Sequence, residues 1–279
     1  MIGGAAASLP PFELRPPALG DWRRGNTGVE GVWRFDSDAP GREVLITALV
    51  HGNELCGAWA LLDLLAAGVR PRRGALTLAF CNLAAFDLFD ARHHDASRFV
   101  EQDMNRVWGE GLRAAASPSI EQRHAMDLLR FVERADALLD LHSMHEPGPP
   151  LLLTGPHQRN IELARRLAAP EYVVVDAGHT EGQRMRDHGR FGNPASNAES
   201  LLIECGWHGA KTSRHVARDL CARFLAATGV VDEADLPRAW RLADTASQQV
   251  LNVTHAVVAR SDNTRFAQPW VSGQRIAEA

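Results

Sequence analysis

Short apolar runs alternate along the chain with segments whose apolar residues recur at helical spacing. The first run, residues 43–50, predicts a buried strand, and residues 54–67 then predict a helix that Gly68 ends. Further strands are expected at 75–81, 135–141, 150–154, 171–175 and 201–205, and further helices at 119–134, 158–167 and 211–227. Strands separated by helices predict an α/β fold, with a mainly parallel or mixed sheet flanked by helices.

Two long polar segments interrupt this pattern. Residues 87–111 carry few regular signals and are too long to be an idle connection, so we expect them to carry function. Residues 178–197 form a loop that is rich in glycine, arginine and histidine. After the last helix the chain becomes acidic and turn-rich, and residues 250–260 then alternate in a way typical of strands. We therefore expect a main domain over residues 1–232 and a small C-terminal β domain over residues 233–279.

Composition narrows the class of protein. A chain of 279 residues can bury a large core, and its net charge of -4 is unlike the basic balance of a nucleic-acid binder. Residues 1–17 have no cationic start followed by a long apolar run, so neither a secretory signal nor a membrane span is expected. Four cysteines without paired spacing argue against a Cys-based zinc site and a disulfide framework. These features favour a cytoplasmic enzyme that acts on a small molecule without nucleic-acid or membrane partners, and they leave a homo-oligomer open.

Candidate chemical groups lie at the ends of three predicted strands. His51 and Glu54 follow the strand at 43–50, His142 follows the strand at 135–141, and Glu204 lies at the end of the strand at 201–205. Because open α/β sheets bind ligands at the carboxyl ends of their strands, we expect these side chains to converge.

His51 and Glu54 have a spacing that lets an imidazole and a carboxylate meet one metal ion. Catalytic zinc sites take three protein ligands of the His, His and carboxylate kind and leave a position for water, and His142 fits as the third ligand. The H-x-x-E pattern also arises by chance, and a strand-end histidine is commonly an ordinary polar residue. The alternative histidine ligands are His93, His94, His145, His157 and His208.

Four short motifs follow one another along the chain: H-G-N-E at 51–54, R-F-V-E-Q-D-M-N-R at 98–106, D-L-H-S at 140–143 and I-E-C-G at 203–206. Together they resemble the succinylglutamate desuccinylase/aspartoacylase family, which belongs to the wider carboxypeptidase-like zinc hydrolases. The resemblance implies that residues 1–232 form the zinc-hydrolase catalytic domain. It also implies a C-terminal β domain that is short for the family.

The resemblance further implies one zinc ion per chain, with His51, Glu54 and His142 as its ligands and Glu204 as the general base. Zinc lowers the pKa of a bound water, and a nearby carboxylate that is not a ligand can take the proton and return it to the leaving amine. Without the resemblance, the favoured interpretation of Glu204 is an ordinary ion pair at the end of a strand.

The first polar segment contributes three candidate substrate-facing residues by the same resemblance. Arg98 is expected to polarise the scissile carbonyl, and Asn105 and Arg106 are expected to bind the carboxylate of the amino-acid half. Asp103 is expected to brace this loop.

The second polar segment offers Arg184, Arg186 and Arg190, any of which could recognise a further carboxylate of the substrate. The residues alone do not choose among the three. For His179 and His188, in the same segment, we expect a role in loop conformation.

Taken together, the sequence predicts a zinc-dependent hydrolase that deacylates an N-acyl amino acid or a related small amide. A carboxypeptidase-like peptide hydrolase and a non-catalytic zinc-containing ligand-binding protein are the alternatives. Aspartoacylases also use a tyrosine from the C-terminal region, whereas the one tyrosine here, Tyr172, falls in a predicted strand. Strict specificity for N-acetylaspartate is therefore not expected.

Overall fold

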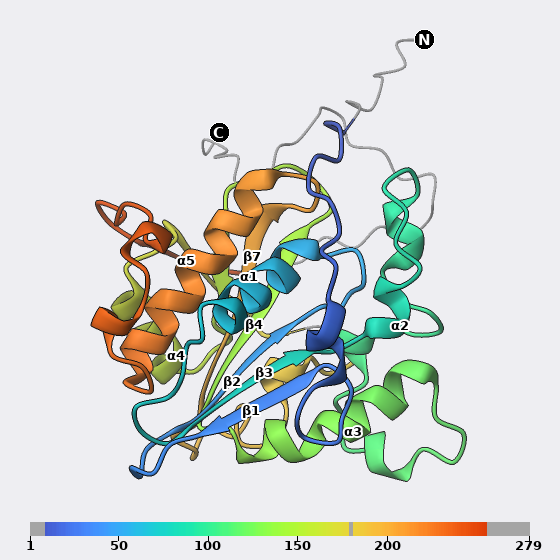
Figure 1. The fold of residues 1–279 in the computed structure, drawn as a ribbon, viewed down its shortest axis with the longest axis horizontal. Coiled ribbons are helices and arrows are strands. Elements are labelled where there is room, and N and C mark those ends of the chain that lie inside the picture. The colour runs from blue at the N-terminus through green and yellow to red at the C-terminus, as the bar shows by residue number, and fades with distance from the viewer. Residues whose placement is uncertain (1–8, 179–180, 256–279) are drawn as a thin grey trace.

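The computed structural model describes residues 9–178 and 181–255. Its centre is an eight-stranded mixed sheet in the order β1-β3-β2-β4-β7-β5-β6-β8, with helices on both faces (Figure 1). This architecture confirms the predicted α/β fold.

The strands are β1 (Val32–Asp36), β2 (Glu43–Ala48), β3 (Ala75–Phe80), β4 (Ala137–Met144), β5 (Leu151–Leu153), β6 (Tyr172–Val175), β7 (Glu199–Trp207) and β8 (Gln249–Asn252). The neighbours β3, β2, β4 and β7 run parallel to one another. At one side of the sheet, β1 is antiparallel to β3. At the other side, β5 is antiparallel to β7, whereas β6 is parallel to both β5 and β8. The carboxyl ends of four adjacent central strands therefore lie at one edge of the sheet.

The helices are α1 (Leu55–Ala66), α2 (Leu83–Phe86), α3 (Ile120–Arg134), α4 (Gln158–Leu167) and α5 (Lys211–Thr228). Short 3-10 helices are η1 (Gly20–Arg24), η2 (His94–Ser97), η3 (Met104–Arg106), η4 (Leu112–Ala114), η5 (Met185–Asp187), η6 (Glu233–Asp235) and η7 (Arg238–Trp240). α3 begins with a capping box, because Ser119 Oγ accepts from the N–H of Gln122 and the Gln122 side chain accepts from the N–H of Ser119.

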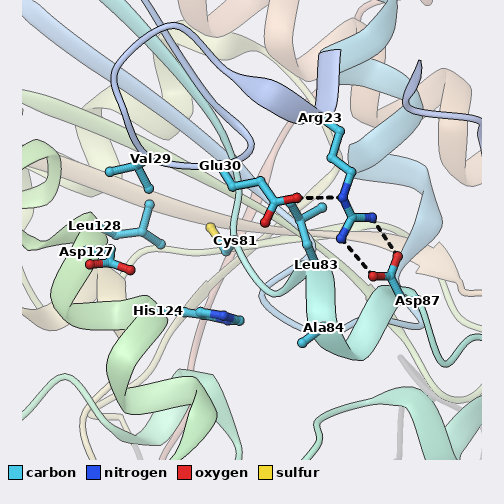
Figure 2. Close-up of a pocket in the computed structure, with 10 residues that line it drawn as sticks. All are labelled: Arg23, Val29, Glu30, Cys81, Leu83, Ala84, Asp87, His124, Asp127 and Leu128. Atoms are coloured by element: carbon cyan, nitrogen blue, oxygen red, sulfur yellow. Dashed lines mark hydrogen bonds and ion pairs between the residues drawn. The ribbon is translucent and has the colours of Figure 1, made fainter. Parts of the chain in front are cut away.

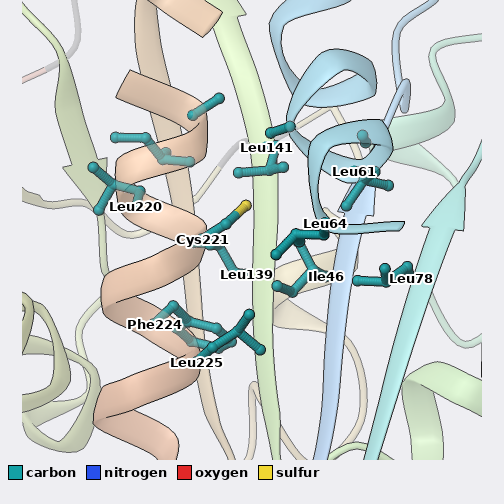
Figure 3. Packing of buried hydrophobic residues seen from close by; sticks show 14 of the residues in the cluster. Ile46, Leu61, Leu64, Leu78, Leu139, Leu141, Leu220, Cys221, Phe224 and Leu225 are labelled. Carbon is teal, nitrogen blue, oxygen red and sulfur yellow. The ribbon is translucent and has the colours of Figure 1, made fainter. Parts of the chain in front are cut away.

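Alternation along the strands divides the core between the two faces of the sheet. Ile46 of β2 and Leu139 of β4 pack with Leu61 of α1 and Leu220 of α5, as Figure 3 shows. Leu45, on the opposite side of β2, belongs to the cluster that α3 covers. Each fully buried leucine or isoleucine contributes about 1.5–3 kcal/mol to folding, which explains why the central strands are almost continuously apolar.

The structure differs from the sequence prediction in three places. β1 was not predicted. β4 continues three residues past its predicted end, so His142 lies inside it, and β7 continues two residues past its predicted end. In the expected C-terminal β domain, β8 joins the main sheet beside β6, while residues 256–279 lie outside the described part; the boundary at residue 232 stays a prediction. None of the helices in the described part of the chain combines the length and apolarity required to cross a membrane.

Candidate active site

The turn after β2 brings His51 to the carboxyl edge of the sheet. Leu49 adopts a left-handed conformation with a φ of 58°, which costs about 1–2 kcal/mol in a non-glycine residue and turns the chain out of the strand. At Gly52 an added Cβ would lie 2.5 Å from the carbonyl oxygen of Ser97, so only glycine permits this approach. The N–H of Gly52 donates to the carbonyl of Arg98 at 3.1 Å. The turn therefore holds the loop that carries Arg98 against His51.

One face of β4 and β7 presents three polar side chains. Leu139 and Leu141 point into the core beneath α1 and α5, so the alternate residues Asp140 and His142 lie on the opposite face of β4. His142 is the register partner of Glu204 in the parallel pair with β7. The strands therefore place an imidazole and a carboxylate side by side.

His51, Glu54 and His142 form a compact group that could hold a metal ion. The Nδ1 of His51 is 2.8 Å from Glu54 Oε1, and the Nδ1 of His142 is 2.8 Å from Glu54 Oε2. One ligand atom from each of the three residues lies within 4.8 Å of the others, and all three residues are buried. The predicted trio is thus brought together, with both histidines turning Nδ1 toward the carboxylate.

Two further carboxylates back the imidazoles. The Nε2 of His51 is 3.0 Å from Asp103 Oδ1, and the Nε2 of His142 is 2.9 Å from Asp140 Oδ2. Thr47 Oγ1 donates to the other oxygen of Asp140 at 2.7 Å. Carboxylates in this position fix the ring orientation of metal-binding histidines and raise their basicity. The sequence interpretation missed Asp140, although the D-x-H spacing in a strand places both side chains on one face.

Opposite charges balance within this buried group. Burial alone would raise the pKa of Glu54, but His51 and His142 outweigh burial and hold that pKa well below its usual range. Burial would likewise lower the pKa of His142, but Asp140 and Glu54 raise it well above its usual value. Positive charge is therefore favoured beside Glu54, and a divalent cation supplies such charge when it displaces protons from its ligands.

Glu204 lies beside the trio without belonging to it. Burial, followed by the negative charge of Glu54, raises the pKa of Glu204 well above its usual range. Its Oε2 is buried and has no hydrogen-bond partner among the described residues. An orphaned carboxylate oxygen is costly unless a cation or a proton donor faces it. The donor set and this orphaned oxygen together fit a divalent cation such as zinc.

Arg98 reaches the trio from the first polar loop. Its Nη2 donates to Asp103 Oδ2 at 3.1 Å, and its Nη1 lies 3.6 Å from Glu54 Oε1. About a third of the Arg98 side chain is exposed, so one guanidinium edge remains open to a ligand. Asp103 thus joins Arg98 to His51, which agrees with the bracing role expected of it.

Asn105 and Arg106 lie in η3 of the same loop. Asn105 is buried, and its Oδ1 accepts from the N–H of Met185 at 3.0 Å, which ties this loop to the second polar segment. Arg106 Nη1 donates to the Asn105 carbonyl at 2.9 Å. Asn105 therefore has a structural contact besides the substrate-binding role predicted for it.

Glu121, at the start of α3, holds the first polar loop (residues 87–111) in place through hydrogen bonds. Its buried carboxylate accepts from the N–H groups of Val100, Glu101 and Gln102 at 2.6, 3.2 and 3.1 Å. These charge-assisted hydrogen bonds lower the pKa of Glu121 against the opposing effect of burial. The sequence interpretation did not single out Glu121, which does not lie in the loop that it holds.

Arg184 is the arginine of the second polar segment that faces the site. Its Nη1 is 2.6 Å from Asp176 and its Nε is 2.7 Å from Asp187, so the buried guanidinium is locked in place. Its Nη2 is buried and has no hydrogen-bond partner among the described residues. Arg184 therefore keeps a donor available for an anionic group.

Arg186 and Arg190 are engaged elsewhere. Arg186 is buried and donates to the Thr154 carbonyl, and burial lowers its pKa. Arg190 is half exposed and pairs with Asp136 at 2.9 Å. The Nε and Nη1 of Arg186 also lack hydrogen-bond partners among the described residues, so it is the position of Arg184 at the site that separates the three arginines.

All seven residues predicted for the site line one hollow at the carboxyl ends of β2, β4 and β7. Its volume is about 260 Å³. Arg184 lines it as well, as do His145 and Ser143. The seven predicted residues are His51, Glu54, His142, Glu204, Arg98, Asn105 and Arg106. Their roles stay predictions, but their convergence is a property of the structure.

Another hollow, of about 230 Å³, lies between α3 and the chain around η1 (Figure 2). Figure 2 shows Arg23 held by Glu30 on one side and by Asp87 on the other, with His124 across the hollow. Arg23, Glu30 and Asp87 therefore satisfy one another, whereas the Nδ1 of His124 is buried without a hydrogen-bond partner among the described residues. The residues that line this hollow are separate from the metal-capable trio.

The alternative histidines take other positions. His93 is exposed beside Asp90, and His157 contacts the carbonyl of Gly192. His208 is buried, with its Nδ1 2.7 Å from Ser143 Oγ. In the second segment His188 contacts the Trp108 carbonyl at 2.6 Å, in keeping with a conformational role, while His179 lies outside the described residues. His94 and His145 gather around Asp95.

The sequence and fold of this chain resemble those of known proteins. Residues 40–200 match the family described as "Succinylglutamate desuccinylase/Aspartoacylase catalytic domain", which spans more than half of the chain. No curated protein sequence matches the chain.

Several solved structures share the fold. A succinylglutamate desuccinylase/aspartoacylase from Rhodobacter sphaeroides has a TM-score of 0.60 at 20% identity, over 81% of this chain and 66% of that one. A protein of the same description from Shewanella frigidimarina has a TM-score of 0.61 at 17% identity, over 80% of this chain and 71% of that one. The product-bound ectoine utilization protein EutE of Ruegeria pomeroyi has a TM-score of 0.57 at 16% identity, over 79% and 63%. The chain thus spans less than two thirds of the length of EutE and of the Rhodobacter protein.

Proposed function

The chain belongs to the succinylglutamate desuccinylase/aspartoacylase family, and on this premise we propose that it is a zinc-dependent hydrolase that deacylates an N-acyl amino acid or a related small amide. The observation that carries the proposal is the single hollow lined by a His–Glu–His group, a separate buried carboxylate and several arginines. A reacting amide needs each of these groups within reach of one carbonyl.

The metal ligands in this proposal are His51, Glu54 and His142. Support comes from the two Nδ1 atoms facing Glu54 and from the carboxylates of Asp103 and Asp140 behind the rings. Zinc bound there would supply Lewis acidity, which polarises a carbonyl group and acidifies water.

Glu204 is the general base in this proposal. Its orphaned Oε2 accepts a proton from the attacking water and returns it to the leaving nitrogen, so that the amide is cleaved to an acid and an amine. A position beside His142, outside the ligand trio, is what this task requires.

The arginines divide the binding work. Arg98, whose Nη1 lies near Glu54, stabilises the developing oxyanion, and Asn105 with Arg106 holds the carboxylate of the amino-acid half. Arg184 is assigned to a second carboxylate, because it lines the hollow, whereas Arg186 and Arg190 are not among the lining residues. Its Nη2 also has no hydrogen-bond partner among the described residues. We place the enzyme in the cytoplasm, in keeping with four buried free cysteines.

A substrate panel with metal analysis of the same sample tests this proposal. The panel contains N-acetyl, N-succinyl and N-formyl amino acids, and peptides of matching composition. The proposal predicts stoichiometric zinc and turnover of at least one N-acyl amino acid. Cleavage of peptides alone would instead identify a carboxypeptidase-like hydrolase. Stoichiometric zinc without turnover of any compound would identify a non-catalytic ligand-binding protein.

A further inference from the structure

A second group of metal-capable side chains lies at the rim of the hollow. His94 and Asp95 come from η2, and His145 follows β4. One ligand atom from each lies within 4.8 Å of the others. We propose that these three residues, here called the rim site, bind a second divalent cation of the zinc class, separate from the ion of the catalytic trio.

The rim site repeats the donor arrangement of the trio. Asp95 Oδ1 is 2.9 Å from the Nδ1 of His145 and 3.1 Å from the Nδ1 of His94. Two imidazole nitrogens thus face one carboxylate, as they do at Glu54. Imidazole and carboxylate donors together suit zinc and neighbouring transition metals rather than calcium or magnesium, which prefer all-oxygen ligands.

The orientation of His94 points to a ligand. Its Nδ1 is buried and makes no hydrogen bond of acceptable geometry with the described residues, although Asp95 is close. The ring packs on Phe12 with a centroid distance of 5.2 Å, which limits its freedom to turn away. An imidazole nitrogen that is held in place without a hydrogen bond is suited to coordinate a metal ion.

A third imidazole stands beside the rim site. The ring centroids of His94, His145 and His208 are 5.9, 6.1 and 6.5 Å apart, so the three rings surround one small volume. The Nδ1 of His208 lies 2.7 Å from Ser143 Oγ, a contact that holds this ring beside the rim site.

The exposure of the rim site determines how a metal ion reaches it, and the contacts behind its imidazoles determine how tightly the ion binds. Asp95 and His145 are more than half exposed, so an ion can enter from solvent. None of the described residues places a carboxylate against the Nε2 of His94 or His145, whereas both histidines of the trio have one. Such outer partners are worth about 10- to 100-fold in metal affinity, so the rim site binds more weakly than the trio by about that factor.

Zinc titration of the tag-free, metal-free full chain tests the rim site, with bound metal counted after equilibrium dialysis. Wild type is expected to bind Zn²⁺ in two steps that differ by about 10- to 100-fold. Asp95→Ala and His145→Ala are each expected to lose the weaker step and keep the tighter one. His142→Ala is expected to lose the tighter step and keep the weaker one. His93→Ala, an exposed neighbour outside the group, is the matched control and should keep both steps.

Three outcomes would overturn the rim site. These are a single step in wild type, a weaker step that survives both Asp95→Ala and His145→Ala, and loss of the tighter step in either variant. None of them depends on catalysis. If the proposed hydrolase activity fails while two steps appear, the rim site stands without it.

Discussion

Glu204 lies directly opposite His142 across the parallel strands β4 and β7. Neighbouring strands are about 4.8 Å apart, so the two side chains project side by side from one face of the sheet. His142 contacts Glu54 and Asp140, whereas Oε2 of Glu204 has no hydrogen-bond partner among the described residues. The sheet itself thus holds one carboxylate near the proposed metal ligands but outside their group.

Glu204→Gln separates proton transfer from metal binding. The amide keeps the shape of the side chain but cannot take a proton, so kcat is expected to fall by about 10²- to 10⁴-fold. Zinc content should stay at the wild-type level, because Glu204 is outside the ligand trio. Turnover and metal analysis of one preparation measure both, with the exposed Glu162→Gln as the control. Wild-type turnover in Glu204→Gln would remove this residue from the mechanism.

Asp140→Asn tests the carboxylate behind His142. The amide can still accept from Thr47 Oγ1, but it loses the negative charge beside the Nε2 of His142. Zinc affinity is expected to fall by about 10- to 100-fold, as measured by competition with a chelator. The matched control is Asp219→Asn, an equally buried aspartate that pairs with Arg223. That control should lose stability and keep zinc affinity; equal affinities in wild type and Asp140→Asn would refute the backing role.

Arg184→Lys tests which arginine of the second polar segment recognises substrate. Lysine keeps the charge but loses the forked donors, and a charged hydrogen bond is worth about 1.5–3 kcal/mol, or roughly 10- to 150-fold in kcat/KM. The loss should appear mainly in KM. Arg190→Ala, whose side chain pairs with Asp136 away from the hollow, should leave KM unchanged. The reverse pattern in steady-state kinetics would move the anion-binding role to Arg190.

His208 makes stability depend on pH. Its pKa is lowered to about 4 by burial, so between about pH 6.5 and 4 the unfolded chain takes up a proton that the folded chain does not. Acid therefore favours unfolding. From pH 7 to 5 the metal-free wild type is expected to lose about 2 kcal/mol more than His208→Gln. Urea unfolding at both pH values measures this difference, and equal losses in the two proteins would contradict it.

The fold was predictable where local pattern and burial agree. Ile46 faces α1 and α5 while Leu45 faces α3, so β2 reads as a continuous apolar run, and the capping box at Ser119 marks the start of α3. β1 (Val32–Asp36) was not predicted because it is a short, half-buried edge strand that pairs with residues 39 to 47 positions further along the chain.

The part of the site that depends on local sequence was also predictable. His51 and Glu54 are three residues apart, so their meeting is a local property of one turn. Arg184 could not be chosen from the sequence, because its position depends on Asp176 and Asp187 and on the contact between Asn105 and Met185. Such contacts join separate segments, and no spacing rule encodes them.

We propose that amide hydrolysis requires a metal ion held by His51, Glu54 and His142. The most direct test of this proposal is the rate of hydrolysis of the best N-acyl amino acid by the metal-free chain, before and after one equivalent of Zn²⁺. Without metal, no turnover is expected; zinc should restore turnover in wild type but not in His142→Ala. Full turnover by the metal-free chain, or restoration in His142→Ala to the wild-type rate, would contradict it.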